Sequence, residues 1–445
     1  MFRLPRTFAF AAMLIAASSA HAQPQANGRE LGFAVSVAQD GDLPGAVAKA
    51  QAACMATIHI SISWNNLHPD TLSWNANVLT DLDLINLYFA SIGVKVELQI
   101  GPVNTVVDQS PAELVGLPYN DPRVVRDMQR TLDTVFAHFS GVQLAALNIS
   151  NESDVLWGTD AALYSQFGQF MQEVAPHAKA AYFASHGDTL SVGTTFTWAG
   201  LTDPLRAPLC QIANAASDHI SATYYGIQND FTVKPPTDVI ADMDLLMAMQ
   251  PNPQPVRLAE IGYPTSSTCV SSDELQVQFV QAAFTAWDQH AYRMKYMGWF
   301  LLTDWDSATV DTLGAYYGIS SPVFLEYLRT LGLRTNPGSG TDKPAYQTLL
   351  CELQARSFCA TACANGIPEQ TLRDPVIAPN PAKDIIRITG ATVVDGTPIN
   401  FVSMAGLTQF TLPFAVEIDI SMIPPGVYAV RIPGLAPALL VIAGR

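Results

Sequence analysis

The chain has 445 residues, of which 49% are hydrophobic and 14% are charged, so it carries enough apolar side chains for a large buried core. Its net charge of -16 argues against nucleic acids and anionic membranes as partners, because a phosphate surface requires a basic footprint. A neutral or cationic partner, such as a polysaccharide, remains open.

The first 22 residues have the pattern of a cleavable secretory signal. Arg3 and Arg6 precede an apolar run over residues 8–17, and Ala20-His21-Ala22 ends the segment. This run is too short to span a bilayer, and no later stretch reaches about 18 uninterrupted apolar residues. We therefore expect an exported protein without a transmembrane segment, secreted or held at the outer cell surface.

After the signal, short apolar runs alternate with longer segments of helical periodicity. Apolar stripes at 3–4 spacing predict helices over 82–89 and 124–139, and Ser271 with Glu274 predicts a capping box after the seventh strand. Strands are expected at 32–38, 57–64, 94–100, 142–149, 180–185, 219–225, 256–261 and 297–304.

Eight strand–helix repeats predict an α/β fold of the (β/α)8 TIM-barrel type over residues 28–355. A doubly wound open sheet is the competing fold. It would normally carry a glycine-rich phosphate turn after its first strand, and no G-x-G-x-x-G follows residues 32–38.

The residue pattern of the chain changes after the predicted barrel. A polar excursion over 332–350 ends in a last helix, and a cysteine-bearing connector follows at 356–373. From 374 to 445 the apolar runs are short, without helical periodicity, and punctuated by Gly and Pro. This pattern predicts a small, sandwich-like all-β domain at the C-terminus.

An even number of cysteines in an exported chain indicates disulfide bonds. Fifteen pairings of the six are open, and we expect most of the cysteines to be bonded. The spacing of the last two lacks the partner motif of a zinc site, so neither a metal nor another cofactor is expected. The six are Cys54, Cys210, Cys269, Cys351, Cys359 and Cys363.

Two glutamates stand where a barrel places its catalytic groups, at the C-terminal ends of strands. Asn151-Glu152 follows the fourth expected strand, and Glu260 lies in the last part of the seventh, in RLAEIG. A pair of carboxyls is what glycosidic cleavage requires, because one donates a proton to the leaving oxygen and the other attacks the anomeric carbon. The plainer alternatives are a solvated loop acid at Glu152 and an ion pair between Glu260 and Arg257 or another arginine of the barrel.

The two glutamates and the residues around them resemble the motifs of a known enzyme clan. Asn151-Glu152, with Glu260 in AEIGYPTS, resembles clan A of the glycoside hydrolases, and GWFLLTDWD and GTDKPAYQTL are similar to the eighth strand and closing helix of that clan. The resemblance covers about residues 30–355. It implies a retaining enzyme with Glu152 as acid/base and Glu260 as nucleophile. Ser153 stands where many members have Pro, and the Arg or His of their sugar site has no clear match here.

Further residues at strand ends are candidates for binding the sugar. The resemblance implies that a Tyr at the end of strand six bonds the nucleophile, and only one of two neighbours can do so because they face opposite ways. Aromatic faces suit the C–H side of a sugar ring, although each residue could instead belong to the core. The candidates are Asn151, Tyr225 (preferred) or Tyr224, Trp305 (preferred) or Trp299, Trp64 and His186; Asp304 and Asp306 either bind hydroxyls or cap a loop.

The C-terminal segment has a resemblance of its own. APNPAKDIIRITG, PINFVSMAG and IDISMIPPGVYAVRI are similar to the type IX secretion sorting domain, although the end, VIAGR, lacks the basic strand of many members. The resemblance implies export machinery as a partner. An ordinary accessory β-domain, such as one that binds carbohydrate, is the alternative.

The sequence thus predicts a secreted retaining glycosidase for a β-linked polysaccharide or oligosaccharide. A catalytically silent sugar-binding barrel and a transglycosidase with the same residues are the alternatives. The sugar, the linkage and the choice of endo or exo cleavage stay open.

Overall fold

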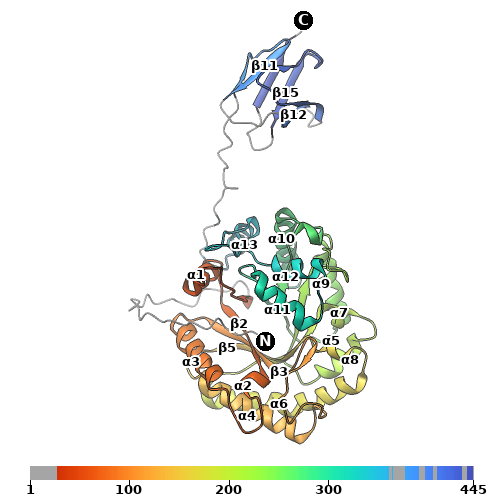
Figure 1. Cartoon of the computed structure of the whole chain (residues 1–445). Coiled ribbons are helices and arrows are strands. Elements are labelled where there is room, and N and C mark those ends of the chain that lie inside the picture. Colours follow the sequence, from red (N-terminus) through yellow and green to blue (C-terminus); the bar gives the residue numbers. More distant parts are fainter. Residues whose placement is uncertain are drawn as a thin grey trace. The chain divides into compact units, whose positions relative to one another are not determined.

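The computed structural model describes residues 28–359, 363, 376–389, 396–403, 408–432 and 438–443. The expected signal and most of the expected connector lie outside these residues. The chain divides into two compact units between Cys363 and Ala364 (Figure 1). No helix of the described residues is long and apolar enough to cross a membrane.

The first unit is a closed barrel of eight parallel strands, as predicted (Figure 1). Each strand pairs with its neighbours in order, and β1 closes the ring by pairing with both β2 and β9. A two-residue strand, β4 (Val107–Asp108), pairs antiparallel with the end of β3. The barrel strands are β1 (Glu30–Phe33), β2 (Thr57–Ser63), β3 (Lys95–Asn104), β5 (Leu144–Asn151), β6 (Val192–Thr197), β7 (His219–Tyr225), β8 (Val256–Gly262) and β9 (Met294–Trp299).

Helices surround the barrel, and their ends follow ordinary capping rules. In α4, Asp121 accepts a hydrogen bond from the Arg123 amide and Pro122 occupies the first turn. The predicted apolar stripe of this helix is buried. The helices are α1 (Leu43–Ala52), α2 (Trp64–Leu67), α3 (Ala76–Ser91), α4 (Pro122–His138), α5 (Ser153–Trp157), α6 (Ala161–His186), α7 (Trp198–Thr202), α8 (Ala207–Ala213), α9 (Asp238–Met249), α10 (Asp273–Gln289), α11 (Ser307–Tyr317), α12 (Pro322–Arg329) and α13 (Pro344–Ala355).

Several local predictions are wrong. The expected strand over 180–185 belongs to α6, whose inward face repeats at helical spacing with Ala178 and Tyr182 buried, and β6 follows it instead. The cap of α10 is Ser272, whose hydroxyl accepts from the Leu275 amide, while the Ser271 hydroxyl donates to a loop carbonyl. The expected first and eighth strands also end early, at Phe33 and at Trp299.

A buried polar network fills part of the barrel interior. The Glu97 carboxylate accepts from the Arg257 guanidinium through Nε at 3.0 Å and through a second, shorter bond. The Asn148 amide donates to the same carboxylate at 2.9 Å, and its oxygen lies 2.9 Å from Nε2 of His219. The Arg257 guanidinium also lies over the Tyr296 ring at 4.3 Å. The Arg257 guanidinium therefore pairs with Glu97, and the alternative prediction of an ion pair between Arg257 and Glu260 is wrong.

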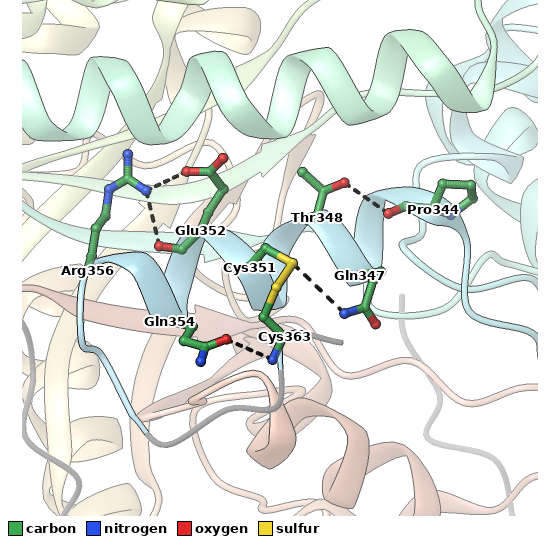
Figure 2. The surroundings of a disulfide bond; sticks show 8 residues. All are labelled: Pro344, Gln347, Thr348, Cys351, Glu352, Gln354, Arg356 and Cys363. Carbon is green, nitrogen blue, oxygen red and sulfur yellow. Dashed lines mark hydrogen bonds and ion pairs between the residues drawn. A yellow bond between two sulfur atoms is a disulfide. The ribbon is translucent and has the colours of Figure 1, made fainter. Parts of the chain in front are cut away.

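Two disulfides cross-link the C-terminal segment of the barrel unit. Cys54, after α1, joins Cys359, 305 positions later, and Cys351 of α13 joins Cys363. The Cys363 amide also donates to the side-chain oxygen of Gln354 on the same helix (Figure 2). Most cysteines are bonded, as predicted.

The second unit contains two antiparallel sheets, which agrees with the predicted all-β domain. Their apolar faces form one buried cluster that includes Ile386, Phe401 and Val430. The sheets are β10 (Val376–Ala378), β11 (Ile385–Thr389) and β14 (Ile418–Asp419), and β13 (Thr408–Pro413), β12 (Pro398–Ser403), β15 (Gly426–Arg431) and β16 (Ala438–Ile442).

Candidate functional site

The two glutamates lie at the C-terminal end of the barrel, on strands four and seven of the ring. Glu152 directly follows β5, and Glu260 is the fifth residue of β8. Strand register links them through β7, because Thr223 is the register partner of Glu260 and also donates a hydrogen bond to Glu152. The fold therefore brings together two side chains that stand far apart in the sequence.

Glu152 is held by two hydroxyl groups. The Thr223 hydroxyl donates to Oε1 at 2.6 Å, and the Thr105 hydroxyl donates to Oε2 at 2.9 Å. The backbone of Glu152 is left-handed, with φ 46° and ψ 38°, and its side chain does not cap α5. A non-glycine residue in this region costs about 1–3 kcal/mol, which a fold retains where a side chain must point in a particular direction.

Asp154 secures the turn that carries Glu152. Its buried carboxylate accepts from the Thr197 amide at 2.8 Å and from the Thr197 hydroxyl at 2.5 Å. The Arg206 guanidinium lies 3.3 Å away. A Cβ on Gly200 would lie 2.2 Å from this carboxylate, so the close approach of α7 requires glycine there. The start of α5 is thus fixed to β6 and α7.

Glu260 is almost fully buried, with 8% of its surface exposed. The Tyr225 hydroxyl donates to its Oε2 at 2.5 Å. The Tyr225 ring packs edge-on against Phe300 at 6.0 Å and Tyr327 at 5.5 Å. The tyrosine that the sequence favoured therefore faces the carboxyl.

Burial dominates the electrostatics of both carboxyls. It raises the pKa of Glu152, although the bonds from Thr223 and Thr105 oppose the shift. Burial, followed by the negative charge of Glu152, raises the pKa of Glu260 to about 8, while the bond from Tyr225 opposes that shift. Since each carboxylate disfavours ionisation of the other, the arrangement favours one protonated and one ionised carboxyl.

Aromatic residues from α11 and α12 reach the same site. The Tyr316 hydroxyl donates to the Asn104 carbonyl at the end of β3 at 2.6 Å. Burial, and then the charges of Glu152 and Glu260, raise the pKa of Tyr317, whose hydroxyl also bonds Thr105, a partner of Glu152. Sequence reasoning missed these residues, because nothing in the order of the elements shows that the segment after β9 returns to β3.

The other predicted aromatic residues divide between the site and the outer core. Trp305 lies beyond β9 and packs edge-on against Phe300 at 5.3 Å, within the aromatic group around Tyr225. Trp299, in contrast, is buried against Phe279 of α10. Tyr224 also faces outward and donates to Asp242 of α9.

The remaining candidates occupy different places. Asn151 is buried beside Glu152, and its Nδ2 lies 3.3 Å from Oδ1 of Asn104. Trp64 donates to Thr131 of α4 and is fully buried. His186 ends α6 rather than a strand and bonds the Phe139 carbonyl, so the structure does not bring it to the carboxyls.

Two aspartates after β9 have structural partners. Asp304 forms a buried ion pair with Lys343 at 2.9 Å, and Asp306 caps α11 by accepting from the Thr309 amide. Among the described residues, no group of three or more His, Cys, Asp or Glu side chains is arranged to hold a metal ion.

No protein-family model matches the chain, and no curated protein matches its sequence. Solved structures match its fold. A GH5_18 protein from Bifidobacterium longum subsp. longum ATCC 55813, in complex with Manβ1-4GlcNAc, is 15% identical over 74% of this chain and 79% of that chain, with a TM-score of 0.56. The exo-β-1,4-mannosidase Op5Man5 from Opitutaceae bacterium strain TAV5 is 14% identical over 75% of this chain and 61% of that chain, with a TM-score of 0.53. This similarity supports the barrel fold.

Proposed function

We propose that the protein is a retaining glycoside hydrolase whose acid/base is Glu152 and whose nucleophile is Glu260. The observation that supports it best is the half-buried Glu152 and the buried Glu260 at the C-terminal ends of β5 and β8, where burial raises the pKa of both carboxyls and the charge of Glu152 raises that of Glu260 further. Glycoside cleavage by double displacement requires one protonated and one ionised carboxyl at the same time. The barrel neighbours with glycosidase names agree with this proposal.

The two roles are assigned from strand position, because the enzymes that the sequence resembles carry the acid/base after strand four and the nucleophile on strand seven, where Glu152 and Glu260 lie. The Tyr225 hydroxyl favours the ionised form of Glu260 and opposes the burial that raises its pKa to about 8, so the reacting state is the one in which Glu260 is ionised and Glu152 holds the proton. In the first step a Glu260 oxygen bonds to the anomeric carbon, the bond to the leaving oxygen breaks, and the Glu152 proton passes to that oxygen. In the second step Glu152 takes a proton from water, whose oxygen bonds to the anomeric carbon as the ester to Glu260 breaks. A transglycosidase would use a sugar hydroxyl in place of water.

We propose a neutral β-linked glycan as the substrate, cleaved without a metal or cofactor. Asn151 and the half-buried aromatic residues Tyr225 and Trp305 are its proposed contacts. We assign no sugar contact to Tyr224, Trp299, Trp64 or His186, whose partners lie elsewhere. Because two neighbours are named for, or hold, β-linked mannose, β-1,4-mannosides and Manβ1-4GlcNAc are the first compounds to test.

The experiment is a panel of β-linked polysaccharides and oligosaccharides incubated with the purified protein, with products separated by chromatography. Product formation that is lost in Glu152→Ala and Glu260→Ala supports the proposal. Binding of a glycan without any product would favour the silent sugar-binding barrel. The anomer released first distinguishes retention from inversion.

We further propose that the C-terminal unit directs export, so that the protein is secreted or held at the outer surface. The support is the sorting-type pattern in its sequence, together with a compact unit separate from the barrel. Deleting residues from 374 onward should leave the purified barrel active and stop its passage across the outer membrane. Normal release of the truncated protein into the medium would contradict this role.

A further inference from the structure

The hydroxyl groups around Glu152 come from two distant strands. Thr223 belongs to β7, and Thr105 follows the last residue of β3 with a left-handed φ of 51°. Their side chains are buried, and each donates to a different oxygen of the carboxyl. The Thr105 amide also donates to the Asn151 carbonyl at 2.8 Å, which ties this strained residue to the end of β5. Both threonines are therefore held in place with respect to Glu152.

Hydroxyl groups suit a carboxyl that must change its protonation state. A hydroxyl donates to a carboxylate and accepts from a protonated carboxyl, whereas a guanidinium or ammonium group only donates and favours the charged form. Thr105 has a second acceptor, since its Oγ1 lies 3.2 Å from Oδ1 of Asn104. Its proton can therefore turn to Asn104 when Glu152 is protonated and return when Glu152 is ionised.

We propose that Thr105 and Thr223 are positioning residues that hold the Glu152 carboxyl in one orientation through both halves of the reaction. This inference rests on the acid/base role proposed for Glu152. Two hydrogen bonds use one lone-pair site on each oxygen and leave the others for the leaving group and for water.

Replacing Thr223 leaves the other titratable groups that face Glu152 with their partners, whereas replacing Thr105 also removes a hydrogen bond to Tyr317. Asp154 comes from the same turn and is paired with Arg206, and Glu260 comes from β8. The tyrosines that sense the charge of Glu152 come from β7, α11 and α12 and are Tyr225, Tyr316, Tyr317 and Tyr327. A shift in the titration of Glu152 that occurs in the Thr223 variant as well as in the Thr105 variant can therefore be assigned to the lost hydroxyl.

The test compares Thr105→Val and Thr223→Val with Thr105→Ser and Thr223→Ser. Valine keeps the shape and removes the hydroxyl, so ionised Glu152 loses a donor and its pKa rises. The alkaline limb of kcat/KM should move to higher pH, because the first step requires protonated Glu152. The value of kcat/KM on an unactivated glycoside should fall about tenfold to a hundredfold in each valine variant. Serine should restore both properties.

A second measurement keeps this test separate from the proposed function. In protein labelled with ¹³C at the glutamate carboxyl carbon, the Glu152 signal is the one missing from Glu152→Gln, and its titration needs no substrate. A higher midpoint in the valine variants but not in the serine variants supports the inference even if no glycoside is cleaved. An unmoved midpoint, or serine variants as impaired as valine variants, would overturn it. If a valine variant does not fold, the smaller Thr→Ala replacement takes its place in the same comparison.

Discussion

The barrel contains two sets of buried or half-buried glutamates, and their partners differ in kind. Glu97, in the interior, accepts from the Arg257 guanidinium, and although burial raises its pKa, this ion pair and its hydrogen bonds outweigh burial and hold the pKa below the ordinary value. Glu152 and Glu260, at the C-terminal ends of the strands, accept from threonine and tyrosine hydroxyls, and their pKa values are raised.

The difference shows that burial alone does not identify a reactive acid. A guanidinium compensates a buried carboxylate and leaves it permanently charged, which suits a structural element. Hydroxyls orient the carboxyl but leave its proton available near neutral pH. Substitutions in the first set should therefore change stability, and substitutions in the second should change chemistry.

The largest effect is expected at Glu260. Glu260→Ala removes the proposed nucleophile, so turnover should fall by several orders of magnitude with any leaving group. Glu152→Ala should slow an activated aryl glycoside far less, because its leaving oxygen scarcely needs a proton. Azide should restore turnover in both, giving a β-glycosyl azide for Glu152→Ala and the opposite anomer for Glu260→Ala. Near-normal rates in both variants on the natural substrate would remove the catalytic assignment.

Glu97→Gln tests the expectation that the carboxylate paired with Arg257 contributes to stability. It leaves the Arg257 charge buried without its carboxylate, which should cost about 3–5 kcal/mol in the free energy of unfolding. Denaturant titration measures this loss. The double variant Glu97→Leu with Arg257→Met removes both charges and should recover most of it. A single variant as stable as the wild type would mean that the ion pair does not compensate burial here.

The free energy of unfolding should change with pH because of Glu260. Its folded pKa of about 8 lies above the ordinary value of 4.5, so the folded protein keeps a proton that the unfolded chain releases. The contribution of Glu260 to stability is therefore complete below about pH 4.5 and is lost as the pH rises toward 8. Glu260→Gln should remove a slope of at most about 1.4 kcal/mol per pH unit and be more stable than the wild type above pH 8. Parallel stability curves would contradict the raised pKa.

A disulfide variant provides a destabilised control that touches neither set of carboxyls. Cys54→Ser opens the cross-link to Cys359 and should cost about 2–4 kcal/mol, measured by denaturant titration under non-reducing conditions. Its kcat should stay unchanged at temperatures where it is folded. Thiol titration of unreduced, denatured wild type should find the two free cysteines, Cys210 and Cys269. A fall in kcat like that of Glu260→Ala would mean that lost activity only reports lost stability.

The sequence predicted the fold because the strand–helix alternation is regular. It singled out Glu260 because an acid is costly inside an apolar strand, and Glu152 because it follows the fourth expected strand. The same signal is present at Glu97 in KVELQI, which sequence analysis did not single out, and only the fold shows that Arg257 compensates it. The hydroxyls of Thr105 and Thr223 were not predictable, since threonine is common in strands and the two residues come from β3 and β7.

The wrong prediction of a strand over 180–185 also has a physical cause. The segment around Tyr182 is short and apolar, and such a run fits a buried helix as well as a strand, so periodicity alone does not decide between them. The true strand, β6, contains three threonines in VGTTFT and lacks a clear apolar run. His186 was a candidate only because of the misplaced strand.

The smallest effect is expected at Tyr225, which has a matched control beside it. Tyr225→Phe removes the donor to Glu260, so the pKa of Glu260 rises further and the acidic limb of kcat/KM moves to higher pH. A bond to a charged group contributes about 1.5–3 kcal/mol, so the rate at neutral pH should fall about tenfold to a hundredfold.

Tyr224→Phe removes the same atom from the neighbouring residue, whose hydroxyl donates to Asp242 outside the barrel at 2.8 Å. Since successive strand residues face opposite sides, this variant should lose stability while its pH profile of kcat/KM stays unchanged. Equal losses of activity in the two variants would mean that Tyr225 acts only through packing. An acidic limb that moves in Tyr225→Phe alone would show that a single hydroxyl adjusts the proton affinity of the nucleophile.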